Sequence, residues 1–79
     1  MPSQNDLAGT SPALKRLSRR ERQVLKFVVE GKSDGEIAAL LQVAPKSVES
    51  YRRRMMDKLR IDDLPGLVKF AIRNGITAL

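Results

Sequence analysis

Long polar side chains recur at helical spacing between residues 45 and 59, in the stretch PKSVESYRRRMMDKL. At about 100° per residue they gather on one side of a helix, opposite an arc centred on Val48. Arginine can donate two hydrogen bonds to guanine, glutamate can accept one from cytosine, and serine is permissive. This side of the helix could therefore read base edges in the major groove of DNA, or it could simply be solvated. Its outward residues are Lys46, Glu49, Ser50, Arg53 and Arg54.

The same helix carries an apolar arc that must pack against the rest of the chain. Arg52 falls inside this arc. Because arginine is rarely buried without a partner, we expect Arg52 either to snorkel along the packed surface or to pair with a carboxylate such as Glu21 or Glu36. A contact with phosphate is the competing role for Arg52. The members of the apolar arc are Val48, Tyr51, Met55, Met56 and Leu59.

Capping boxes predict where the other helices begin. In SRRE (18–21) and SDGE (33–36), the serine hydroxyl can accept from the N3 amide while the glutamate reaches back to the cap. Asp63 can cap a last helix, which the Asn-Gly pair at Asn74 ends. The chain is thus predicted to be all-α, with four helices and no strand. The first three helices are expected at about 18–30, 34–41 and 45–59.

Composition argues against enzyme chemistry. The chain has 79 residues, with neither histidine nor cysteine, so the commonest general base, the usual zinc ligands and disulfides are all missing. There is also no glycine-rich phosphate loop. We expect no catalytic residue, no metal and no cofactor. No apolar run approaches the roughly 18 residues of a membrane span, and the first residues do not resemble a signal peptide, so no membrane partner is expected.

The charge balance favours an anionic partner. The net charge is +6, from 15 Lys and Arg against 9 Asp and Glu. A second group of cations surrounds the start of the first expected helix, with only Glu21 among them. It could contact phosphates beside a groove, which position a protein without reading sequence, or it could be a solvated face. The group comprises Lys15, Arg16, Arg19, Arg20, Arg22 and Lys26.

The order of elements indicates a helix-turn-helix. A short helix, the tight turn QVAP and a long helix with one polar face match this motif, whose second helix lies in the major groove. Residues 1–14, rich in Ser, Gly, Pro, Asn and Asp, are predicted to be a flexible leader or linker. The helix-turn-helix domain is then expected over residues 15–79.

Motifs over about residues 16–76 resemble the LuxR-type helix-turn-helix domain, the C-terminal effector module of FixJ/NarL-type response regulators. They are LSRRERQVL, EGKSDGEIA, PKSVESYRRRMMDKL and LVKFAIRNGI, in this order. The resemblance implies a four-helix fold in a bacterial, cytoplasmic transcription regulator of a two-component system. It also implies sequence-specific binding to double-stranded DNA, with a recognition helix of about 45–59 in the major groove. No small-molecule ligand is implied for this domain, and RNA polymerase is a further candidate partner.

The resemblance assigns roles by motif position. Base contacts would come from Glu49, Ser50 and Arg53. Contacts to the DNA backbone would come from Lys46, Ser47, Tyr51, Arg54 and Lys58.

A homodimer on DNA is also implied, with the last helix commonly supplying the contact. Phe70 lies outside the centre of that helix's apolar face, so we expect it to be exposed and to contribute to the dimer with Val68. The free domain is expected to be mostly monomeric. The apolar face comprises Leu64, Leu67, Val68, Ala71 and Ile72.

The chain departs from the family pattern at several positions. Ala44 stands where Ser or Thr is frequent, and alanine cannot cap the recognition helix. Asp34 and Gly35 replace residues that often help hold the DNA backbone, and Asp34 would repel phosphate. Arg60 stands where a glycine often ends the recognition helix, so the end of that helix, expected near residue 59, could instead lie a residue or two further.

Two other interpretations remain open. Region 4 of a sigma factor shares the look of RERQVL and EIAALL, but it usually ends near the recognition helix, whereas this chain continues with LVKFAIRNGI. A helical protein-interaction module would instead dock an acidic partner on the basic face. Salt-dependent DNA binding with sequence preference would separate DNA binding from such a module.

Overall fold

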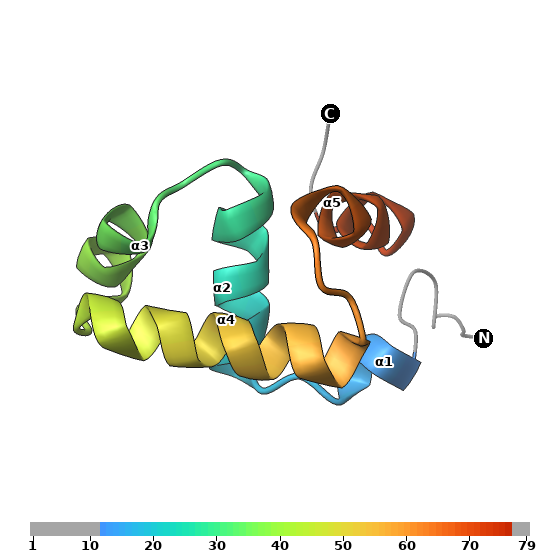
Figure 1. Ribbon diagram of the computed structural model, residues 1–79, viewed down its shortest axis with the longest axis horizontal. Coiled ribbons are helices and arrows are strands. Elements are labelled where there is room, and N and C mark those ends of the chain that lie inside the picture. The colour runs from blue at the N-terminus through green and yellow to red at the C-terminus, as the bar shows by residue number, and fades with distance from the viewer. Residues whose placement is uncertain (1–11, 77–79) are drawn as a thin grey trace.

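A helical arrangement without strands makes up residues 12–76, the part of the chain that the computed structural model describes. Figure 1 shows α4 crossing α2, with α3 near one end of α4 and α1 and α5 toward the other. The expected all-α fold is confirmed. No helix in the described range is long and apolar enough to cross a membrane. The helices are α1 (Pro12–Lys15), α2 (Arg19–Val29), α3 (Asp34–Leu41), α4 (Pro45–Leu59) and α5 (Leu64–Arg73).

Each cap predicted from the sequence is formed. The Ser18 hydroxyl accepts from the Glu21 N–H at 3.1 Å, and the Glu21 carboxylate accepts from the Ser18 N–H at 2.8 Å. Ser33 and Glu36 form the same pair of bonds at the start of α3. The Asp63 side chain caps α5. Local side-chain chemistry therefore sets where these three helices begin.

A short helix that the sequence did not predict, α1, precedes the four expected ones. Its Leu14 is buried in the core beside Leu17. A helix this short is held by such burial rather than by its intrinsic propensity. Residues 12–14 therefore pack with the domain, although their composition predicts a flexible leader, and we propose a boundary before Pro12. The rest of the expected leader lies outside the described residues.

The recognition-helix candidate α4 ends at Leu59 because Arg60 adopts the left-handed conformation, with φ at 57°. The Ile61 N–H then donates to the Met56 carbonyl at 3.1 Å, which closes the helix end. The expected bounds of 45–59 are therefore confirmed, and the later end suggested by the missing glycine is wrong. Arg60 thus adopts a left-handed conformation that glycine would take at little cost but that is strained for a residue with a Cβ atom. Gln42 does the same after α3, with φ at 59°.

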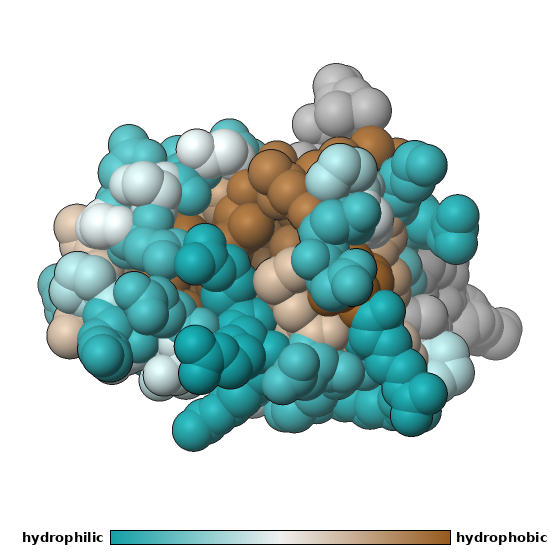
Figure 2. Space-filling model, in the orientation of Figure 1, coloured by the Kyte–Doolittle hydropathy of each residue, from teal (hydrophilic) through white to brown (hydrophobic). Residues whose placement is uncertain are grey.

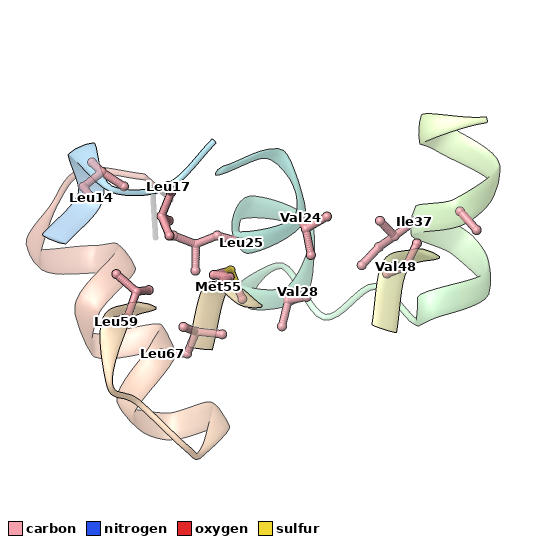
Figure 3. Close-up of a cluster of buried hydrophobic side chains, with 11 residues drawn as sticks. Leu14, Leu17, Val24, Leu25, Val28, Ile37, Val48, Met55, Leu59 and Leu67 are labelled. Carbon is pink, nitrogen blue, oxygen red and sulfur yellow. The ribbon is translucent and has the colours of Figure 1, made fainter. Parts of the chain in front are cut away.

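The core lies where α2, α4 and α5 meet, and α3 extends it along α4 (Figure 3). Val48, Met55 and Leu59, predicted from the apolar arc, are buried. Tyr51 and Met56 lie half-buried at the edges of this arc. The rotation of α4 about its axis, predicted from helical spacing, is therefore confirmed. The largest fully buried side chains are Val24, Leu25, Ile37, Val48, Met55 and Leu67.

Candidate nucleic-acid interface

The outward face of α4 gathers the side chains that could read DNA bases. Val48 and Met55 are fully buried on the opposite side, so the polar residues must project into solvent. Within residues 12–76 these side chains form no hydrogen bond and no ion pair, which leaves them available to a ligand. We call them the α4 reading face; its exposed residues are Lys46, Glu49, Ser50, Arg53 and Arg54.

The turn between α3 and α4 presents this face. Gln42 takes the left-handed conformation, and the Val43 N–H donates to the Ala38 carbonyl at 3.0 Å. Val43 packs against the core and so holds the turn in place. Ala44 provides no side-chain cap, as expected, and Pro45 supplies the first residue of α4. α3, this turn and α4 together form a helix-turn-helix, in which α4 is the second helix.

A shallow depression of about 210 Å³ opens beside the α4 reading face. The serine and tyrosine hydroxyls and the arginine guanidinium that line it can all donate hydrogen bonds to an anionic oxygen. Three of the side chains predicted to contact the DNA backbone meet there. The depression is lined by Ser47, Ser50, Tyr51 and Arg54.

Lys58, also predicted to contact the backbone, is engaged within the protein. Its Nζ donates to Glu21 Oε1 at 2.8 Å, and only 4% of the Glu21 side chain is exposed. Burial raises the pKa of Glu21, but hydrogen bonds from Lys58 and Ser18 together lower that pKa below its ordinary value. The carboxylate is thus charged at neutral pH and holds Lys58 against α2.

The expectation that Arg52 pairs with a carboxylate is confirmed, but its partner is Asp34 and not Glu21 or Glu36. Arg52 Nη1 lies 2.9 Å from Asp34 Oδ1. Glu21 and Glu36 are both engaged by the serines of their capping boxes. The charge of Asp34, expected to repel phosphate, is therefore offset by a guanidinium. Arg52 and Asp34 lie on different helices, so helical spacing alone does not predict this link between α3 and α4.

The structure divides the second basic cluster. Arg20 Nη1 donates to the Leu41 carbonyl at 3.3 Å and so ties α2 to the end of α3. Arg19, Arg22 and Lys26 are exposed on the side of α2 that faces away from its buried residues. They do not join the α4 reading face, because α4 packs on the buried side of α2.

Phe70 is less exposed than the sequence predicts, while its expected contribution to a dimer stays a prediction. The ring is half-buried and packs against the core, while the Phe70 carbonyl accepts from Asn74 Nδ2 at 2.9 Å. The expectation of an exposed aromatic side chain is therefore wrong. The Phe70 ring is large enough to cover part of the edge of a small hydrophobic core.

The apolar face of α5 is instead divided between core and solvent. Leu67 and Ala71 are fully buried, whereas Leu64 and Ile72 are 52% and 41% exposed. Val68 lies half-buried between them. Leu64, Val68 and Ile72 follow one another at a spacing of four residues and form a single stripe, the α5 stripe. A domain of this size cannot shield both sides of such a helix.

Comparisons with known proteins show the family to which this chain belongs. The sequence matches the GerE family, described as bacterial regulatory proteins of the luxR family, over residues 15–71. It is 43% identical over 60 residues to the transcriptional regulatory protein FixJ of Azorhizobium caulinodans, covering 76% of this chain and 28% of that protein. It is 38% identical over 74 residues to the oxygen regulatory protein NreC of Staphylococcus aureus, covering 94% of this chain and 34% of that protein.

A crystal structure gives the same result for the fold. Full-length FixJ from B. japonicum superposes with a TM-score of 0.75 and 35% sequence identity, over 84% of this chain and 32% of that one. The chain therefore spans about a third of the length of the proteins that it matches.

Proposed function

We propose that this chain, which belongs to the luxR family of bacterial regulatory proteins and is a DNA-binding domain, reads a specific sequence of double-stranded DNA. The observation that carries the proposal is the α4 reading face, whose side chains are exposed and unpaired within the described residues opposite a buried core face. In this account α4 lies in the major groove, which admits one helix and displays a distinct pattern at each base pair.

Base recognition is assigned to three residues. Arg53 sits in the middle of the face and can bond guanine through two N–H groups at once. Glu49 can accept from the cytosine amino group, and Ser50 can donate or accept. Together these would read neighbouring base pairs along one edge of the helix. Arg53 should therefore contribute most to sequence preference.

Contacts to phosphate are assigned to the residues around that edge. Ser47, Tyr51 and Arg54 line one depression from which all three can donate, and Lys46 lies one turn earlier than Ser50. Such contacts set position and orientation without reading sequence. Lys58 was expected in this set, but we assign it to holding α4 through Glu21.

Two ion pairs keep the recognition helix in place. Arg52 joins the middle of α4 to the start of α3 through Asp34, and Lys58 joins the last turn of α4 to α2 through Glu21. Holding the helix at two points reduces the ordering needed when DNA binds. These two basic side chains therefore act on recognition through the position of the helix.

Two copies are proposed to bind each DNA site through the α5 stripe. Leu64 and Ile72 supply most of its exposed apolar surface, and Val68, which is half-buried like Phe70, lies between them. One short stripe falls well below the roughly 1,200 Å² of a stable interface, so the free chain should be mostly monomeric. DNA would raise the effective concentration of the second copy.

The wider setting is also proposed from the relatives. These are named as regulatory proteins and are about three times as long as this chain. We therefore propose the effector domain of a two-component response regulator, acting in the cytoplasm, with RNA polymerase as a further partner. No catalytic role is proposed.

Selection from a pool of random DNA duplexes tests the proposed function. We expect a preferred sequence to be enriched, and its affinity to fall with salt at a slope of about −0.9 per phosphate contact. A matched pool of single strands should give no such enrichment. If no duplex is enriched and binding is insensitive to salt, the helical protein-interaction module becomes the better interpretation.

A further inference from the structure

A shallow depression of about 540 Å³, largely open to solvent, lies on the outer side of α2. Its floor is apolar and combines Leu17, which precedes α2, with Ile76, which follows α5. Its rim carries three cations and one amide, and no acidic side chain lines it among the described residues. We call this the α2 hollow; its rim residues are Arg19, Arg22, Gln23 and Lys26.

The rim cations have no anionic partner in the described part of the chain. Arg19, Arg22 and Lys26 form no ion pair there, even though Glu30 follows Lys26 by one helical turn. Glu21 belongs to the same helix but is buried and bonded to Lys58. Like charges three and four residues apart on a helix repel one another. An anionic ligand would therefore offset this repulsion.

DNA held by α4 lies on the other side of the domain. The buried face of α2 is centred between Val24 and Glu21, and Lys58 of α4 reaches that side. At about 100° per residue, the three rim cations fall more than roughly 100° from its centre. Figure 1 shows α4 passing in front of α2, so the outer side of α2 faces away from it. The phosphates contacted by α4 cannot also fill the α2 hollow.

We propose that the α2 hollow docks an acidic protein segment that carries an apolar side chain. Carboxylates of the segment would bond the arginine guanidinium groups, which match them in geometry. The apolar side chain would cover the floor at Leu17 and Ile76. The inference goes beyond DNA binding and rests on the proposed function only in taking α4 as the DNA side. It leaves the domain able to hold DNA and a second protein at once.

A titration of the duplex-bound, ¹⁵N-labelled chain tests this inference. The probe is a short synthetic peptide of Glu and Ala with two Leu one helical turn apart. The control peptide has Gln for Glu and Ala for Leu. We expect the acidic peptide to shift the amide signals of Arg19, Arg22, Lys26 and Ile76, and the control peptide to shift none of them. Signals of α4 should stay unchanged, because DNA covers that face.

Two matched charge reversals separate docking from general attraction to a basic protein. R22E/K26E should weaken peptide binding by about tenfold or more, because like charges then face the carboxylates. K69E/R73E changes the net charge equally on exposed cations of α5 and should keep peptide binding. Both variants should bind the duplex equally, and their melting temperatures should show that both fold.

Several outcomes would overturn the proposal. Peptide signals on α4, competition between peptide and duplex, or equal losses in the two variants would each mean non-specific attraction. Self-association that R22E/K26E abolishes would place a second copy in the hollow instead. The titration can be repeated on the free chain, so a failure to bind any duplex would count against the proposed function alone.

Discussion

Lys58 Nζ lies 2.8 Å from Glu21 Oε1, and this contact joins the last turn of α4 to the first turn of α2. The same carboxylate oxygen accepts from the Ser18 N–H. One buried glutamate thus begins one helix and holds the end of another. Lys58, although it lies on the proposed DNA-binding helix, therefore stabilises the packing of α4 on α2.

Replacing Lys58 should therefore cost stability. K58M leaves the buried carboxylate of Glu21 without its cation, and we expect the free energy of unfolding to fall by about 1–3 kcal/mol in urea denaturation. R54M removes an exposed, unpaired cation from the same helix and should change it by less than about 0.5 kcal/mol. For DNA binding we expect R54M to have the larger effect of the two variants. It should reduce the magnitude of the salt slope by about 1, because it removes one phosphate contact. A fully stable K58M with a reduced salt slope would return Lys58 to the phosphate contacts.

Acid should weaken the fold through Glu21. Its pKa is lower in the folded chain than the ordinary 4.5, so the folded state holds fewer protons than the unfolded state near that pH. The stability contributed by the charged carboxylate is present above about pH 4.5 and is lost as the pH falls through the folded pKa. Urea denaturation from pH 7 downward should therefore show E21Q as less stable at pH 7, with the gap closing in acid.

Glu36 offers the matched control for this pH dependence. Hydrogen bonds from Ser33 and the charge of Lys32 lower its pKa too, but its carboxylate is exposed and forms no ion pair within residues 12–76. E36Q should keep the capping box, because the glutamine carbonyl can also accept from the Ser33 N–H, and it should have a smaller effect on stability. A gap between E21Q and the unsubstituted chain that stays constant with pH would contradict the role given to the charged pair.

Arg60 marks a position where a simple change should stabilise the chain. Its φ of 57° is strained for any residue with a Cβ and free of that strain for glycine. We expect R60G to raise the free energy of unfolding by about 1 kcal/mol, and R60A to give no such gain. Thermal unfolding of the two variants measures this difference. A glycine variant no more stable than the alanine variant would show that Arg60 compensates through other contacts.

Ile72 tests the α5 stripe. Because its side chain is 41% exposed, I72E should fold normally while it places like charges at the proposed contact between two copies. Sedimentation of the complex should then show one copy per DNA site, against two for the unsubstituted chain. K69E, also on α5, serves as the charge control. Two copies retained by I72E would move the dimer contact elsewhere.

The starts of the helices could be predicted from local sequence, whereas the side-chain pairs that join different helices could not. Ser18, Ser33 and Asp63 act on amides three residues away, so their roles can be read from spacing alone. The pair between Glu21 and Lys58 joins residues 37 apart, and only the packing of α2 on α4 brings them together. The burial of Phe70 could not be predicted from spacing, because the depth of a small core depends on every helix around it.

The α4 reading face could be predicted because one helix supplies all of it. Helical spacing alone placed Ser50 and Arg53 opposite Val48 with Glu49 beside them, and all three are exposed in the structure. The α2 hollow could not be predicted in this way. It needs Leu17 and Ile76, which lie far apart in the sequence and meet only in the fold.

The affinity of R53A for the selected duplex and for a scrambled duplex of equal length tests base reading by α4 most directly. Loss of Arg53 should cost about 1–3 kcal/mol on the selected duplex and much less on the scrambled one, because only the former offers the matching guanine. R54A is the control and should weaken binding to both duplexes about equally. Equal losses for R53A on the two duplexes would contradict the account and assign Arg53 to the DNA backbone.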